Sequence, residues 1–253
     1  MMFIHSPLDQ FEVVSLLGFT SALIGNFHIS LTNFGLYSLI ILFIVIGLHI
    51  LSNNENSLIP SKFSIFFESI YVTVLSMVKS QIGSNHEIYL PLIYSLFFFI
   101  LISNLVGNIT YSFTITTSVI LTLGLSVIIF LGFTILSISI HKFNFFSTFI
   151  PEGCPLPLVP LLVLIELASY CSRAISLGVR LFSNMTAGHV LLAILSNFFF
   201  KAFSSGLIFF IITLVPFLLF LAIIMLEVSV SVIQAYVFIL LTCSYIKGAI
   251  YLH

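Results

Sequence analysis

Charged side chains are nearly absent from this chain, and this shortage restricts its possible folds more than any other feature. Lys and Arg number 7 and Asp and Glu number 8 among 253 residues, so only 6% of the chain is charged. A water-soluble domain carries roughly 25% charged residues. Because so few charges cannot coat a surface that faces water, the chain is predicted to lie in a lipid bilayer.

Long apolar stretches divide the chain into segments that can cross a membrane. A bilayer core needs about 20 mostly apolar residues in helical conformation. The stretches that fit are 31–52, 89–107, 117–140, 161–199 and 206–246. The sequence therefore predicts an all-α polytopic membrane protein with about five transmembrane helices. We expect residues 1–253 to form a single membrane domain.

Residues 61–83 differ in pattern from these five stretches. Polar residues, among them Lys62, Glu68 and Lys79, alternate there with apolar residues at helical spacing. The apolar residues are Phe63, Phe66, Phe67, Ile70, Val74 and Met77. This pattern predicts an amphipathic helix that lies at the membrane interface.

The last two apolar stretches, 161–199 and 206–246, are too long for one perpendicular crossing each. We expect them to form two long, tilted helices in an antiparallel hairpin. The sequence Phe203-Ser-Ser-Gly206 predicts the turn between them, and Pro216 predicts a bend in the second helix.

Ionisable residues inside these spans are candidates for function, because a charge in a bilayer is costly. The candidates, together with the polar residues near them, are Glu166, Arg173, Arg180, Asn184, His189, Glu227 and Gln234. Both arginines of the chain belong to this set. Positions seven apart on a helix differ by only about 20° in direction. Glu166, Arg173 and Arg180 therefore share one face of their helix.

An antiparallel hairpin places residues that are equally far from its turn opposite each other. On this rule Arg180 faces Gln234 and His189 faces Glu227, both about a turn near residue 207. His189 follows Arg180 by nine residues, which turns it to roughly the opposite side of the helix. We therefore expect two polar environments at different depths, which indicates an ion or proton pathway in the last two helices.

A purely structural role is the alternative for the same residues. Arg180 could be held in a salt bridge with Glu166 or Glu227, and His189 could be a packing residue. Gln234 and Asn184 could serve as interhelical hydrogen-bonding groups. Arginine keeps its proton at any accessible pH, so Arg180 suits a fixed charge better than a proton carrier. His189 and Glu227 can titrate and suit a relay.

Composition and motifs exclude several other functions. A net charge of −1 argues against nucleic-acid binding, which needs a basic surface. The seven histidines form no HxxxH or HExxH pair, so no metal, haem or other cofactor is expected. The three cysteines are scattered and predict no disulfide framework. No GxxxxGK[ST] loop is present, so the chain is not expected to bind ATP.

Several stretches resemble subunit a of the ATP synthases. The stretch SLGVRLFSNMTAGH, from Ser176 to His189, is similar to the signature of that family, and so is LEVSVSVIQAY, from Leu226 to Tyr236. SPLDQFE near the start and SYIKGAIYLH at the end resemble the mitochondrially encoded fungal form. The resemblance therefore runs from end to end.

The resemblance implies a role for each matching position. Arg180 matches the essential arginine, which faces the carboxylate of each passing rotor-ring subunit and separates two half-channels. Glu227 and His189 match the acid and the histidine of the half-channel open to the intermembrane space. Bacterial relatives commonly carry these two residue types in exchanged positions. The remaining matches are Asn184 and Gln234 near the arginine, and Glu166 and Arg173 toward the matrix half-channel.

The resemblance also implies a setting: a non-catalytic, proton-translocating stator subunit of the Fo sector, in the mitochondrial inner membrane. Its implied partners are the c-ring, other Fo stator subunits and membrane lipid. Removal of residues 1–5 is implied as well.

Three other functions compete with this interpretation. They are a redox subunit of a respiratory complex, a structural membrane anchor, and a sodium instead of a proton pathway.

Overall fold

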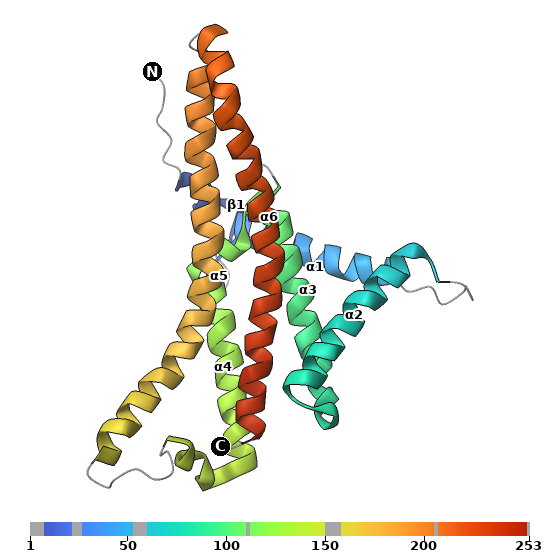
Figure 1. The fold of residues 1–253 in the computed structure, drawn as a ribbon, viewed down its shortest axis with the longest axis vertical. Helices are drawn as coiled ribbons and strands as arrows, with labels where there is room; N and C mark the ends of the chain where they lie inside the picture. The colour runs from blue at the N-terminus through green and yellow to red at the C-terminus, as the bar shows by residue number, and fades with distance from the viewer. Residues whose placement is uncertain are drawn as a thin grey trace. The chain divides into compact units, whose positions relative to one another are not determined.

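The structure is a computed structural model, and it describes residues 8–21, 27–52, 60–109, 112–149, 158–204 and 207–251. Residues 1–5, for which removal is predicted, lie outside the described residues, as do residues 205–206 of the predicted turn. Figure 1 shows a chain built mainly from long helices. They are α1 (Asn33–Ser52), α2 (Lys62–Gln81), α3 (Leu90–Gly107), α4 (Val119–His141), α5 (Val159–Ser204) and α6 (Leu207–Ile250).

Six helices of the described residues are long and apolar enough to cross a membrane, which confirms an all-α polytopic membrane protein. α2 has the lowest mean hydropathy of the six, in keeping with its amphipathic pattern. Its position at the interface stays a prediction. α5 ends at Ser204 and α6 begins at Leu207, as the predicted turn requires. Pro216 lies inside α6, which continues through it.

Short elements connect or precede the helices. They are the 3-10 helices η1 (Asp9–Phe11), η2 (Ser84–Tyr89), η3 (Ile115–Thr117) and η4 (Lys142–Phe149), and the strands β1 (Ser15–Ser21) and β2 (Phe27–Thr32). The strands pair antiparallel and were not predicted. Their signal is a period of two in β2, where Phe27, Ile29 and Leu31 alternate with polar residues.

The described chain divides into two compact units, and each is considered by itself. Unit 1 comprises Met1–Ile50, Phe99–Ser118 and Ser183–Gln234. Unit 2 comprises Leu51–Phe98, Val119–Phe182 and Ala235–His253.

Unit 2 has a hydrophobic core between α2, α3 and α6. Its members are Val74, Met77, Val78, Ile82, Leu90, Ile93, Ile239, Cys243 and Ile246. Phe67 stacks on Phe98 beside this core, with ring centroids 5.5 Å apart. Part of the predicted apolar face of α2 is therefore buried against protein, whereas Phe63 and Phe66 on the same helix are exposed.

α4 and α5 approach closely within unit 2. A Cβ atom added to Gly178 would lie 2.6 Å from Ser126 Oγ and 2.8 Å from the carbonyl oxygen of Thr122. Only a glycine fits such a gap, and small residues at helix contacts are typical of membrane proteins. This contact fixes α5 against α4 two residues before Arg180.

In unit 1, α5 and α6 run side by side in opposite directions, as the orange and red helices of Figure 1 show. Asn104 on α3 donates from Nδ2 to the carbonyl oxygen of Ser231 on α6, at 3.2 Å. α3 is thereby attached to the part of α6 that carries Glu227 and Gln234.

Candidate functional site

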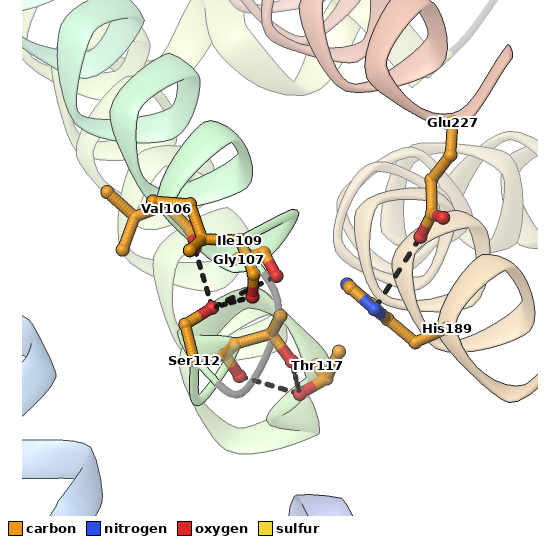
Figure 2. A network of polar contacts seen from close by, with 8 residues as sticks. Val106, Gly107, Ile109, Ser112, Thr117, His189 and Glu227 are labelled. Atoms are coloured by element: carbon orange, nitrogen blue, oxygen red, sulfur yellow. Dashed lines mark hydrogen bonds and ion pairs between the residues drawn. The ribbon is translucent and has the colours of Figure 1, made fainter. Parts of the chain in front are cut away.

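His189 and Glu227 face each other across the two long helices of unit 1 (Figure 2). Nδ1 of His189 lies 3.6 Å from Oε1 of Glu227, within ion-pair range and slightly long for a hydrogen bond. The side chains are 14% and 7% exposed. The pairing predicted from the hairpin rule is therefore confirmed, and it joins two groups that can each carry a proton.

Gly188 makes this approach of Glu227 possible. A Cβ atom at position 188 would lie 2.7 Å from Oε1 and 3.0 Å from Cδ of Glu227. Contacts under 3 Å at a Cβ atom require something to move. Sequence reasoning missed Gly188 as a site residue, because the need for a glycine appears only when the facing carboxylate is placed.

A cavity of about 740 Å³ surrounds the two side chains, and we call it the His189 cavity. Among its lining residues are Gln10, Asn33, Asn108, Ser112, His189 and Glu227. No described residue forms a hydrogen bond with His189 Nε2, Glu227 Oε1 or either amide atom of Asn108, although all four atoms are shielded from the surface. Buried polar atoms need partners, and a cavity of this size, lined in part by polar groups, has room for water molecules to supply them.

One wall of the His189 cavity is the connection between α3 and α4. Figure 2 shows its hydroxyl groups bonded to backbone carbonyls. Ser112 Oγ donates to the carbonyl oxygens of Val106 at 2.6 Å and Ile109 at 2.7 Å, and Thr117 Oγ1 donates to that of Thr114 at 2.6 Å. These side-chain-to-backbone bonds hold the connection, and with it this wall of the cavity, in shape.

Gln234 is hydrogen-bonded to Asn184 within unit 1. Its Oε1 accepts a hydrogen bond of 3.0 Å from Asn184 Nδ2, one turn further along α5 than Arg180. The predicted facing of Gln234 and Arg180 stays a prediction, because the two residues belong to different units. The alternative reading of these two residues, an interhelical hydrogen bond, describes their contact.

Unit 2 holds a second cavity, of about 800 Å³, which we call the Arg180 cavity. Its lining residues include Glu166, Tyr170, Arg173, Arg180, Tyr245 and Lys247. The predicted stripe of Glu166, Arg173 and Arg180 therefore opens into one space. Tyr245 and Lys247, which come from α6, were not among the predicted site residues.

Glu166 and Arg173 form an ion pair in the Arg180 cavity. Oε1 of Glu166 lies 3.6 Å from an Nη atom of Arg173, and the two side chains are 40% and 50% exposed. The hydroxyl of Tyr245 donates to the carbonyl oxygen of Arg173 at 3.1 Å, which links α6 to α5. Ion pairs this exposed add little to stability, so these charges are available for other contacts.

Among the described residues, no three or more His, Cys, Asp and Glu side chains form a group that could hold a metal ion.

Comparisons with known proteins identify the family of this chain. The family model described as ATP synthase A chain matches residues 35–247. A protein of Mycosarcoma maydis named ATP synthase subunit a is 56% identical over 250 residues, which cover 99% of this chain and 98% of that protein. Proteins of the same name from Kluyveromyces lactis and Saccharomyces cerevisiae are 51% and 47% identical, covering 99–100% of this chain and 97–99% of their own lengths. The chain therefore belongs to the ATP synthase A chain family, as a polytopic subunit of the fungal type.

Proposed function

We propose that this chain is the non-catalytic, proton-translocating stator subunit of the Fo sector of ATP synthase in the mitochondrial inner membrane. Its proposed partners are the c-ring, whose subunits each carry a carboxylate, other Fo stator subunits and lipid. The supporting observation is that residues of α5 and α6 line a cavity in each unit, one with His189 and Glu227 in unit 1 and one with Arg180 in unit 2. Two half-channels that must not join require two such spaces.

Proton uptake is assigned to the His189 cavity. A proton from the intermembrane space passes through water in this cavity to His189 and Glu227 and from there to a rotor carboxylate. The two side chains lie 3.6 Å apart, and a small further approach brings them within hydrogen-bond reach for proton transfer. A protonated rotor carboxyl is neutral and can then turn through lipid without the cost of a buried charge.

Arg180 is assigned the fixed charge between uptake and release. It lies on an exposed face of α5 with the small residues Ser176, Ser183 and Ala187, whereas Leu177 and Leu181 are buried. A partner can approach this face closely. A guanidinium there attracts the ionised form of a rotor carboxylate, and the attraction is strong where water is scarce.

Proton release is assigned to the Arg180 cavity. A carboxyl that comes to Arg180 is favoured in its ionised form, and its proton leaves through the space lined by Glu166, Arg173 and Tyr245. The exposed ion pair of Glu166 and Arg173 keeps this space polar, so that water can reach it from the matrix side.

Crosslinking tests whether a rotor ring meets this face of α5. In the assembled complex without its native cysteines, we expect Ser176→Cys to form an oxidative crosslink with a cysteine beside the rotor carboxylate. The matched control is Ile175→Cys, because residue 175 is also exposed but lies about 100° around the helix. Crosslinks through Ile175→Cys alone, or none through either cysteine in an intact complex, would contradict the proposed rotor contact.

Gly188→Ala is expected to slow proton uptake. The added methyl group pushes the Glu227 carboxylate away from its place beside His189. Proton-driven ATP synthesis in reconstituted vesicles should fall at least about tenfold, because small displacements of reacting groups have large effects on rate. The control is Gly132→Ala, since a Cβ atom there meets no atom within 4 Å. Equal rates for the two variants would exclude this role for Gly188.

A further inference from the structure

The segment before the first strand forms a short arm that is tied to the start of α1. The arm comprises residues 8–14. Asn33, the first residue of α1, holds it through both ends of its side chain: Nδ2 donates to the carbonyl oxygen of Glu12 at 3.0 Å, and Oδ1 accepts from the Val14 amide at 3.2 Å. The backbone amide of Asn33 also donates to the Val14 carbonyl oxygen at 3.1 Å. Three hydrogen bonds therefore fix the position of the arm.

The arm reaches the His189 cavity, whose lining includes Gln10 of the arm and Asn33 of α1. The Phe11 ring stands nearly edge-on to the His189 ring, with centroids 6.4 Å apart and an interplanar angle of 70°. Phe11 is partly buried, whereas residues 12–18 that follow it are exposed. The aromatic contact is thus the point at which the arm enters the interior of unit 1.

We propose that the arm forms a functional part of the wall of the His189 cavity and that Phe11 is a positioning residue for His189. An imidazole ring turns easily about its last side-chain torsion, which has broad energy wells. An aromatic edge beside it favours one orientation. In that orientation Nδ1 faces Glu227, and Nε2, for which no described residue is a partner, is left for water or a passing proton.

Asn33 supports the contact between Phe11 and His189 indirectly. It touches neither His189 nor Glu227 in any described contact, and its side chain bonds the backbone on which Phe11 is carried. Loss of the Asn33 side-chain amide and loss of the Phe11 ring should therefore both impair the positioning of His189. This inference rests on the proposed function, because it assigns a task to the arm in proton uptake.

The test uses the complete ATP synthase in vesicles. We expect Phe11→Ala to leave the amount of assembled complex unchanged and to lower proton-driven ATP synthesis about two- to tenfold, the range expected for loss of one aromatic contact. Phe11→Tyr, which keeps the ring edge, should restore the rate. The matched control is Val13→Ala, an exposed position on the same arm.

A double substitution separates this inference from a general loosening of the fold. Asn33→Ala should give a similar defect, and Phe11→Ala with Asn33→Ala should be no worse than either alone, because residues that act as a unit are not additive. Additive defects, or wild-type rates for Phe11→Ala, would overturn the inference. If Phe11→Ala fails to assemble, Phe11→Leu replaces it, and a wild-type rate for that variant likewise overturns the aromatic contact.

Glu227→Gln in the same vesicles distinguishes a failure of the arm's role from a failure of the proposed uptake path. If that variant is slow and the Phe11 variants are normal, the arm has no part in uptake and the proposed function stands. If Glu227→Gln transports protons like the wild type, the proposed uptake path itself is wrong.

Discussion

Vesicles that contain the assembled complex with Arg180→Ala are expected to make no measurable ATP from a proton gradient. The proposed role of Arg180 is to stabilise an ionised rotor carboxylate where water is scarce. Leaving such a charge without its counter-ion costs several kcal/mol, roughly 3 to 5 for a broken buried pair. A cost of that size lowers the rate by at least about a hundredfold.

Two further measurements identify the cause of the loss. Because Arg180 is proposed to separate two half-channels, proton leak without rotation should rise in the same vesicles. Arg180→Lys should recover only part of the rate, because the compact ammonium group of lysine cannot reproduce the planar, bidentate contact of a guanidinium with a carboxylate.

Arg173→Ala is the matched control for Arg180. Both arginines lie on α5 and line the same cavity, but Arg173 is paired with Glu166 in a half-exposed position. We expect its removal to lower the rate far less. A coupled rate near wild type for Arg180→Ala, or equal losses for the two arginines, would favour a structural anchor in which the positive charges only support packing.

The residue pattern predicted the helices because it can be read within each segment by itself. Stretches of about 20 apolar residues and the turn residues near Ser204 are visible without any contact between distant parts of the chain. The pairing of His189 with Glu227 was also accessible, because polar residues are so scarce that a simple hairpin rule leaves few choices. For Gln234 the same rule gave Arg180, and the structure shows a hydrogen bond to Asn184, one turn from Arg180 on the same helix.

The features that sequence reasoning missed depend on distances across the fold. The importance of Gly188 appears only once Glu227 Oε1 is placed 2.7 Å from where a Cβ atom would be. That of Asn108 appears only because no described residue forms a hydrogen bond with its buried side-chain amide. Phe11 gives no signal as one of 29 phenylalanines. Its contact with His189 exists because Asn33 ties down a segment that precedes the first predicted span.

Glu227→Gln is expected to slow proton uptake about a hundredfold, within the range that a positioned acid or base contributes to proton transfer. Glutamine has nearly the same size and shape as glutamic acid, so the close fit against Gly188 is kept and the complex should assemble. The amide cannot take up and release a proton at accessible pH. Proton-driven ATP synthesis and ATP-driven proton pumping should therefore fall together, because both use the same path.

Glu166→Gln is the control for a carboxylate outside the uptake path, and we expect a smaller loss from it because its side chain is 40% exposed and water can replace it. Exchange of the pair, His189→Glu with Glu227→His, keeps one acid and one imidazole at the same approach and should recover activity relative to Glu227→Gln. Loss of the assembled complex in Glu227→Gln would instead indicate that the 3.6 Å contact between His189 and Glu227 holds the helices together. An intact complex with normal proton flow would remove Glu227 from the pathway altogether, since a group that cannot exchange protons cannot relay them.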